Sequence, residues 1–266
     1  MLRALTFALM LIAGGAASAA TPVPDPSEAL RISQAALGQQ LDDHTFRDSR
    51  HQPVQLSDLE GKPLILNLIY TGCTSVCPLV LQNLYAAVEA AQEALGVDSF
   101  TVATIGFDSR HDTPERMRAF ASTQGVDLPN WQFLSADAAT IDRLANQIGF
   151  VITPSPQGFD HLAQTTIVDE AGVVYRHVYG GDFATPAIVE PLKELVFGRR
   201  SSWTSVDGLV NRIRLFCTLY DPRSERYRFD YSVVIGTVIG LLCLTTVAAL
   251  VIREWRRAGG RARPGA

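Results

Sequence analysis

The middle of the chain alternates between two periods of apolar residues. Short β-branched or alternating segments are followed by segments whose apolar residues recur every three or four positions, which predicts strands alternating with helices. The run Leu64-Ile65-Leu66 inside a strand over 63–70 is typical of a central strand covered on both faces. The helix predicted after it has an apolar stripe from Val80 to Leu95, and Gly96 is placed to end it. We therefore predict an α/β domain.

The other expected elements keep this order. A short β-rich entry over 46–56 comes first, and Thr113 and Pro114 mark the start of a later helix as its cap and first position. We expect strands at 100–105 and 131–134, helices at 114–122, 138–148 and 186–196, and a hairpin of 165–168 with 173–179. This is the thioredoxin-like order, with an N-terminal β extension and an insertion between its halves.

Both ends of the chain predict membrane segments. Residues 1–19 combine one cation, an apolar stretch and the small-residue site Ala17-Ser18-Ala19, as in an export signal; a mitochondrial presequence would need several arginines. Residues 232–252 carry no charge and match the roughly 20 residues that span a bilayer. The arginines after them predict a cytoplasmic C-terminus. The expected division is a signal peptide (1–19), a linker (20–43), the domain (44–200), a juxtamembrane segment (201–231), a transmembrane helix (232–252) and a basic tail (253–266).

This topology predicts a single-pass protein of the bacterial inner membrane with its domain in the periplasm. The net charge of −4 includes the basic tail, so the exported part is more acidic still. No surface rich in lysine or arginine is predicted, which argues against a nucleic-acid partner.

The candidate chemistry lies in the run Tyr70-Thr-Gly-Cys-Thr-Ser-Val-Cys-Pro78, at the predicted strand-to-helix turn. Cys73 and Cys77 are one helical turn apart and can face the same side, and a helix N-terminus stabilises thiolates. The pair is suited to soft-metal binding or redox chemistry, including a dithiol that exchanges with a partner's disulfide. A structural disulfide bond is the plainer alternative in an oxidising compartment.

Three separated motifs together resemble the Sco/SenC family of copper-binding proteins. They are the cysteine run, Gly106-Phe-Asp-Ser-Arg-His-Asp-Thr-Pro-Glu115, and Asp160-His161 ahead of a strand. The resemblance covers about 46–198 and implies a thioredoxin fold in which Cys73, Cys77 and His161 bind copper during assembly of the binuclear copper centre of cytochrome c oxidase. Thr74 follows the first cysteine where the family usually has proline, which affects the rigidity of the loop but no ligand.

The chemistry of these three side chains favours copper independently of the family resemblance. Two thiolates and one imidazole suit Cu(I), which prefers sulfur, and Cu(II), which accepts mixed nitrogen and sulfur ligands. Structural zinc normally takes four protein ligands at clustered spacings, and no fourth is evident here. An open coordination position also suits transfer of copper to a receiving protein.

Other polar candidates are given structural or secondary roles. The remaining histidines are interpreted as surface residues. Asp160, Asp108 and Asp112 are candidates to orient the imidazole or to recognise a partner. Capping of turns or of the helix at Pro114 is the alternative, and capping is favoured for Asp112. Cys243 is interpreted as part of the membrane span, and Cys217 as a packing residue or a third thiol near the copper site. The four histidines interpreted as surface residues are His44, His51, His111 and His177.

We therefore expect a membrane-tethered copper metallochaperone, a carrier rather than an enzyme. Its expected partners are the copper-centre subunit of cytochrome c oxidase, other copper chaperones and the inner membrane. A thiol-disulfide oxidoreductase that keeps the cysteines of that centre reduced is the main alternative. A peroxidase of the same fold and a docking protein with a static disulfide are two further possibilities.

Overall fold

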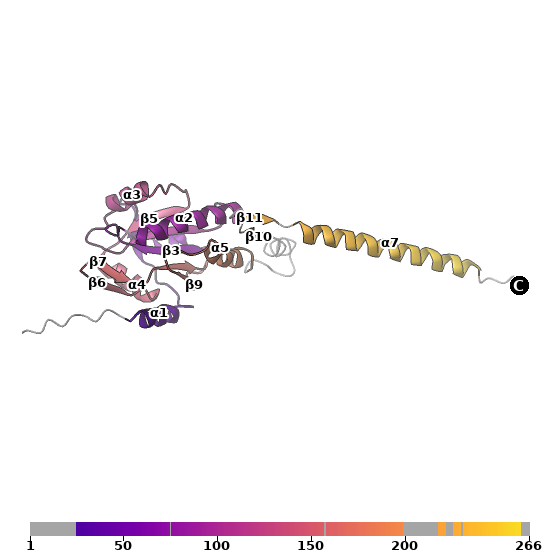
Figure 1. Cartoon of the computed structure of the whole chain (residues 1–266), viewed down its shortest axis with the longest axis horizontal. Coiled ribbons are helices and arrows are strands. Elements are labelled where there is room, and N and C mark those ends of the chain that lie inside the picture. The colour runs from indigo at the N-terminus through magenta and orange to yellow at the C-terminus, as the bar shows by residue number, and fades with distance from the viewer. Residues whose placement is uncertain are drawn as a thin grey trace, which may run out of the picture.

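The computed structural model describes residues 25–74, 76–156, 158–198, 218–221, 226–229 and 231–261 (Figure 1). The predicted signal peptide and Cys217 lie outside these residues. The helices are α1 (Pro26–Ala35), α2 (Val76–Leu95), α3 (Pro114–Thr123), α4 (Ala138–Gln147), α5 (Pro186–Lys193) and α7 (Ser232–Arg261), with short turns η1 (Leu56–Leu59) and η2 (Glu194–Gly198). The strands are β1 (Thr45–Arg47), β2 (Pro53–Gln55), β3 (Leu64–Ile69), β4 (Thr101–Gly106), β5 (Trp131–Ser135), β6 (Ile152–Ser155), β7 (Gly158–His161), β8 (Gln164–Val168), β9 (Val174–Tyr179), β10 (Thr218–Asp221) and β11 (Arg226–Phe229).

One sheet organises the domain, with the strand order β2-β1-β5-β4-β3-β8-β9. Strands β3, β4 and β5 are parallel, whereas β8 runs antiparallel to β3 and β9 antiparallel to β8. The β1–β2 pair adds the expected N-terminal extension at one edge. The predicted α/β, thioredoxin-like class is confirmed, and its central strand β3 leads directly into the cysteine run.

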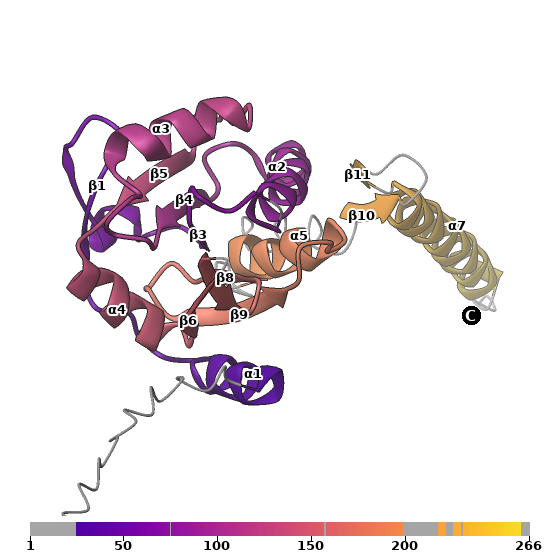
Figure 2. The same ribbon diagram turned by 60° about the vertical axis from the view of Figure 1, so that its left-hand side comes forward.

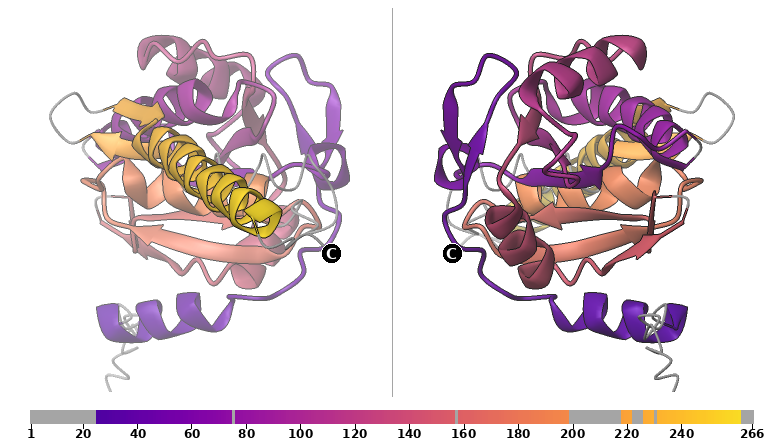
Figure 3. Two further views of the ribbon diagram at one scale, coloured as in Figure 1. Left: turned by 90° about the vertical axis from the view of Figure 1, so that its right-hand side faces the viewer. Right: turned by 90° about the vertical axis from the view of Figure 1, so that its left-hand side faces the viewer.

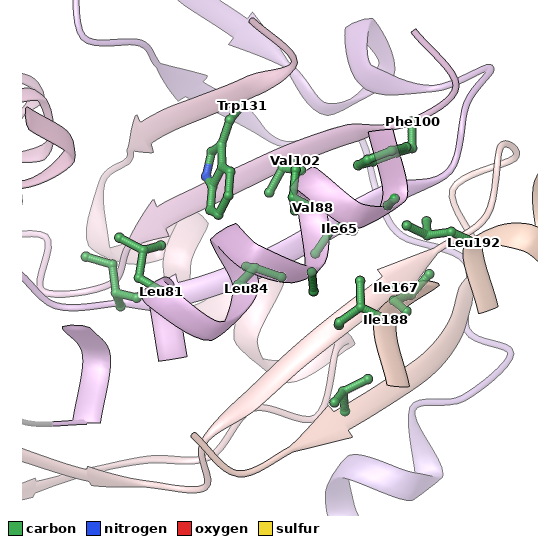
Figure 4. Packing of buried hydrophobic residues seen from close by; sticks show 14 of the residues in the cluster. Ile65, Leu81, Leu84, Val88, Phe100, Val102, Trp131, Ile167, Ile188 and Leu192 are labelled. Carbon is green, nitrogen blue, oxygen red and sulfur yellow. The ribbon is translucent and has the colours of Figure 1, made fainter. Parts of the chain in front are cut away.

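Both faces of β3 are buried, as its unbroken apolar run predicts. Ile65 and Ile69 pack on one face against α2, α3 and α5, and Leu66 packs on the other face against α4 and the N-terminal strands. Figure 4 shows Leu84 of α2 among the side chains of the first cluster. This two-sided core holds β3 and α2 rigidly, so the turn between them has a fixed position.

The local helix signals are confirmed where they were strongest. The Thr113 side chain accepts a hydrogen bond from Arg116 N and Pro114 takes the first position of α3, as predicted. Gly96 ends α2 with φ +95°, a left-handed conformation that glycine adopts without strain.

The predicted linker needs a correction, because part of it is helix α1. Asp25 caps α1, and Pro26 occupies its first turn. The helix docks on the edge of the sheet through polar contacts: Ser33 Oγ donates to Gln164 Oε1 at 2.7 Å, and Gln34 Nε2 donates to Tyr179 Oη at 2.5 Å. Figures 2 and 3 show α1 lying beside β9, the edge strand. Pro26, one of the prolines that suggested a linker, instead marks the start of a helix.

Two histidines that were predicted to lie on the surface are buried. His44 Nε2 is 2.7 Å from Gln147 Oε1. His177 on β9 lies under α1, with Nδ1 3.0 Å from Thr166 Oγ1 and 3.2 Å from Gln164 Nε2. Burial lowers the pKa of His177 to about 4. The prediction was right for His51 and His111, which are exposed.

We expect the burial of His177 to make folding sensitive to acid. Because the folded protein prefers neutral imidazole, its stabilisation is complete above the ordinary pKa of 6.5 and is lost as the pH falls toward about 4. The cost should reach about 1–3 kcal/mol. Denaturant unfolding at pH 7 and pH 5 of the full chain in detergent, compared with His177→Gln, measures this contribution. Equal losses of stability in the two proteins would contradict it.

Helix α7 projects away from the domain (Figure 1). Its stretch Ile235–Arg257 contains an 18-residue window with a mean hydropathy of 2.5 and is long and apolar enough to cross a membrane. It overlaps the predicted span at 232–252. The segment before it, expected only as a juxtamembrane connection, contains the antiparallel pair β10 and β11. Cys243 lies on α7 as an exposed free thiol. The structure thus contains a candidate anchor of the predicted length and position.

Candidate metal centre

Cys73 and Cys77 meet at the start of α2. Cys77 lies in the first turn of the helix, and its backbone N–H donates to Cys73 Sγ at 3.3 Å. Cys73 N in turn donates to the carbonyl oxygen of Tyr70 at 3.1 Å, which closes the turn after β3. Neither cysteine is in a disulfide bond, and both are buried at the edge of the α2 core. The predicted juxtaposition of the two sulfurs is therefore present.

The cysteine turn is held by Asp112, which lies in the loop after β4. One carboxylate oxygen accepts from Thr71 N at 2.8 Å and from Thr71 Oγ1 at 2.7 Å, and the other accepts from Asp108 N at 2.9 Å. Asp112 is 2% exposed, and this burial raises its pKa although the hydrogen bonds oppose the rise. Of the two capping roles expected for Asp112, the helix cap is wrong, because Thr113 caps α3, whereas Asp112 caps the turn that begins at Thr71. Asp108 pairs with His111 at 2.7 Å.

Glycine at position 106 allows the contact between Asp112 and Thr71. A Cβ atom on Gly106 would lie 2.4 Å from Asp112 Cβ and 2.7 Å from Met117 Sδ, closer than packed atoms can approach. The end of β4 therefore needs glycine for the Asp112 loop to fold back toward Thr71. The motif over 106–115 therefore holds the cysteine run in position and supplies none of the expected copper ligands.

Burial controls the acidity of Cys77. Removal from water raises the pKa of its thiol to about 12, and the neighbouring Cys73 adds to the rise. A backbone hydrogen bond from Tyr70 lowers the pKa by less. The expected stabilisation of thiolate by the helix N-terminus is therefore outweighed at Cys77. In the metal-free protein this side chain is a neutral thiol at pH 7, and a metal must displace its proton.

His161 reaches the same region from the β6–β7 hairpin, at the end of β7. Its Nδ1 is 3.2 Å from the carbonyl oxygen of Leu162, so we assign the proton to Nδ1, and this leaves Nε2 as a free electron-pair donor. Burial lowers the pKa of His161, although the Leu162 carbonyl and the charge of Asp160 oppose the shift. A neutral imidazole with one free nitrogen is the form that binds metals.

The hairpin that carries His161 was not predicted. No strand was expected between the helix at 138–148 and the hairpin that begins at 165, whereas β6 and β7 pair as a separate sheet, with Ile152 opposite His161. Pro154 is tolerated there because a two-stranded sheet has two edges. The aromatic rings of Phe107 and Phe150 lie 5.4 and 5.1 Å from the imidazole and hold it in place.

Cys77 and His161 line one cavity of about 10 Å³. On another side, His161 and Asp160 line a second cavity of about 230 Å³, whose wall includes Pro26 and Ala29 of α1. Within the described residues, no three His, Cys, Asp or Glu side chains gather closely enough to hold a metal ion. The structure therefore brings Cys73 to Cys77 and Cys77 toward His161, and the complete ligand set stays a prediction.

Sequence reasoning gave no role to two further residues of this site. The ring of Tyr70 packs against Phe107 and Phe159 at 5.3 Å and lies 6.4 Å from the imidazole. Burial and the neighbouring Cys73 raise the pKa of Tyr70. The other residue is Asn67 of β3, which lines the cavity with Cys77 and His161. Its signal was visible as the one polar residue in the strand Leu-Ile-Leu-Asn-Leu-Ile.

Comparison with known proteins gives a consistent result. The protein-family model described as SCO1/SenC matches residues 34–196. A SCO1 protein homolog of Bacillus subtilis is 26% identical over 156 residues, covering 56% of this chain and 78% of the relative.

Two solved structures share the fold. Bradyrhizobium japonicum ScoI with copper bound has a TM-score of 0.51 and 22% identity, covering 60% of this chain and 99% of that one. BsSco, a member of the Sco family of cytochrome c oxidase assembly proteins in which a disulfide switch was identified, has a TM-score of 0.54 and 18% identity, covering 60% and 96%.

Proposed function

Because this chain belongs to the SCO1/SenC family, we propose that it is a membrane-tethered copper metallochaperone that uses the thiolates of Cys73 and Cys77 and the imidazole of His161. It would deliver copper during assembly of the binuclear copper centre of cytochrome c oxidase. The recipient would be the copper-centre subunit, with other copper chaperones as suppliers. Helix α7 would anchor the domain on the periplasmic side of the bacterial inner membrane, with its arginine-rich end in the cytoplasm.

The observation that carries this proposal is the convergence of Cys77 and His161 on one cavity, with Cys73 Sγ 3.3 Å from Cys77 N. Two sulfurs and a neutral imidazole nitrogen form a donor set that fits copper. The side chains come from two separate units, the cysteine turn and the β6–β7 hairpin. These two units must come closer to complete the ligand set, because no three of the donor side chains gather closely enough among the described residues.

A thiol-disulfide oxidoreductase remains the second candidate, favoured by the closeness of the two cysteines, which form no disulfide bond in this structure. The high pKa of Cys77 argues against that thiol as the attacking nucleophile at neutral pH. A reductase would instead have to attack through Cys73, which is 9% exposed compared with 2% for Cys77. The imidazole has no required part in that exchange.

His161→Ala separates the two functions. We expect the variant to lose at least about 10-fold in Cu(I) affinity, because an inner ligand should matter no less than the outer partners that contribute 10–100-fold. Cu(I) affinity is measured on the full chain in detergent by competition with a chromophoric chelator. His51→Ala, which removes an exposed histidine paired with Glu115, is the matched control.

The same two variants are then tested as reductants of an oxidised peptide from the copper centre. Loss of copper affinity in His161→Ala alone supports the chaperone. Rapid peptide reduction that survives His161→Ala, together with unchanged copper affinity, would support the reductase and contradict the three-ligand site.

A further inference from the structure

Asn67 occupies an unusual place for a polar residue. It lies in β3, whose six residues are all buried, and its side chain is 1% exposed. Because side chains alternate along a strand, Asn67 faces the same side as Ile65 and Ile69. That is the side covered by α2, where the core cluster includes Cys77. The amide therefore lies beneath the cysteine turn.

The Nδ2 group of Asn67 has no hydrogen-bond partner among the described residues. A buried amide without a partner destabilises a fold, and a leucine in its place would complete the apolar run of β3. The side chain is therefore best explained by a partner that the described residues of the metal-free protein do not provide. The position of the amide indicates what that partner is.

Asn67 lines the cavity of about 10 Å³ together with Cys77, His161 and Gln164. The polar atoms of Gln164 are already used: Oε1 accepts from Ser33 Oγ, and Nε2 donates to the Ile148 carbonyl at 3.0 Å. The carbonyl of Ala163, also in the wall, accepts from Gly180 N at 2.9 Å.

Two other side chains of the cavity wall can accept from the amide, the sulfur of Cys77 and Nε2 of His161. The sulfur already accepts from the Tyr70 backbone N–H, but a sulfur has more than one lone pair. The hydroxyl of Thr165, opposite Asn67 on β8, is a further acceptor outside the cavity wall.

The two acceptors in the cavity wall differ once copper is bound. An imidazole nitrogen has a single lone pair, which the metal takes, whereas a metal-bound thiolate keeps lone pairs that can accept hydrogen bonds.

We propose that Asn67 is a positioning residue that donates a hydrogen bond from Nδ2 to the copper-bound sulfur of Cys77, directly or through one water molecule. This inference rests on the proposed copper-binding function. Such a bond stabilises the copper-bound thiolate, so it increases copper affinity, orients the sulfur and withdraws electron density from it.

Asn67→Leu removes the donor and keeps a side chain branched at the same atom. Cu(I) affinity of the full chain in detergent should fall about 10-fold, as for other outer partners of metal ligands. The sulfur-to-Cu(II) charge-transfer band should move to longer wavelength, because sulfur without a hydrogen bond gives up an electron more readily. The thermal midpoint of the metal-free protein should be unchanged or higher, since an unpaired buried group is gone.

Thr165→Val is the matched control. Thr165 pairs with Asn67 across the strands, is equally buried, and has a hydroxyl without a partner among the described residues, but it does not line the cavity. It should leave the absorption band and the affinity unchanged. Asn67→Ala is measured beside Asn67→Leu and should show the same loss, so that a folding defect of the leucine variant does not decide the result.

The outcomes separate this inference from the function on which it rests. If both Asn67 variants bind copper with the absorption band and affinity of the wild type, the role of Asn67 is overturned and the copper-binding function is not. Equal effects of Thr165→Val and Asn67→Leu would also overturn it, because they would show a general packing effect. A wild-type protein that binds no copper would overturn both proposals.

Discussion

Cys77→Ser is expected to abolish tight copper binding by the full chain. The substitution exchanges a sulfur donor for a hydroxyl, which binds the soft Cu(I) ion poorly. Cys77 also lies where the contacts of the site converge, since it is adjacent to Cys73 and shares a cavity with His161. We expect the affinity to fall well beyond the roughly 100-fold that marks the loss of an outer partner. Chelator competition with Cu(I) under reducing conditions measures the loss.

Cys243→Ser is the matched control for this prediction. It makes the same chemical change at an exposed thiol of α7, remote from the cysteine turn (Figure 1). Copper stoichiometry and affinity should match those of the wild type. Tight binding that persists in Cys77→Ser, or that disappears in Cys243→Ser, would show that copper is bound elsewhere.

Asp112→Ala is expected to destabilise the domain strongly and to loosen the cysteine turn. The buried carboxylate accepts from Thr71 N, Thr71 Oγ1 and Asp108 N, and its removal leaves these donors unpaired. The free energy of unfolding should fall by about 2–4 kcal/mol. Copper affinity should fall as well, because Thr71 is two residues from Cys73. Denaturant unfolding of the metal-free full chain, followed by circular dichroism, measures the stability.

Asp108→Ala removes the same charge from the same loop and serves as the control. The Asp108 carboxylate pairs with His111, whose side chain is 67% exposed, and such pairs contribute about 0–1 kcal/mol. The variant also keeps the backbone N–H of residue 108, which donates to the Asp112 carboxylate. Similar losses of stability in the two variants would show that the hydrogen bonds from Thr71 to Asp112 do not stabilise the domain.

The strand, turn and helix around the cysteines could be predicted because their signals are local. The apolar run of β3 predicts a central strand whatever its neighbours are, and the spacing of apolar residues fixes the buried side of α2. The same holds for the start of α3 at Thr113 and Pro114. The proximity of the two thiols follows from this local geometry.

Contacts between distant segments were missed for a physical reason. Asp112 carries the residue type of a helix cap, and only the fold shows that its partner is Thr71. Helix α1 is short and docks through Ser33 and Gln164, which lie 131 positions apart, so no periodicity in 26–35 predicts its contact with the sheet. His177 was predicted to be exposed because a polar residue normally faces water, whereas α1 covers it.

The same difference between local signals and contacts of distant segments applies to the site. The chemistry of Cys73 and Cys77 could be inferred from spacing, whereas His161 was assigned through resemblance to a family. The structure adds the β6–β7 hairpin that carries His161, and the amide of Asn67 beneath the sulfur. Neither could be located without knowing which strands lie side by side.

The most direct test of the three-ligand site is X-ray absorption spectroscopy at the copper edge on the full chain loaded with one equivalent of Cu(I). We predict two sulfur neighbours and one nitrogen neighbour per copper, with the nitrogen lost in His161→Ala and a sulfur lost in Cys77→Ser. A first shell without sulfur, or a nitrogen neighbour that persists unchanged in His161→Ala, would contradict the copper site described above.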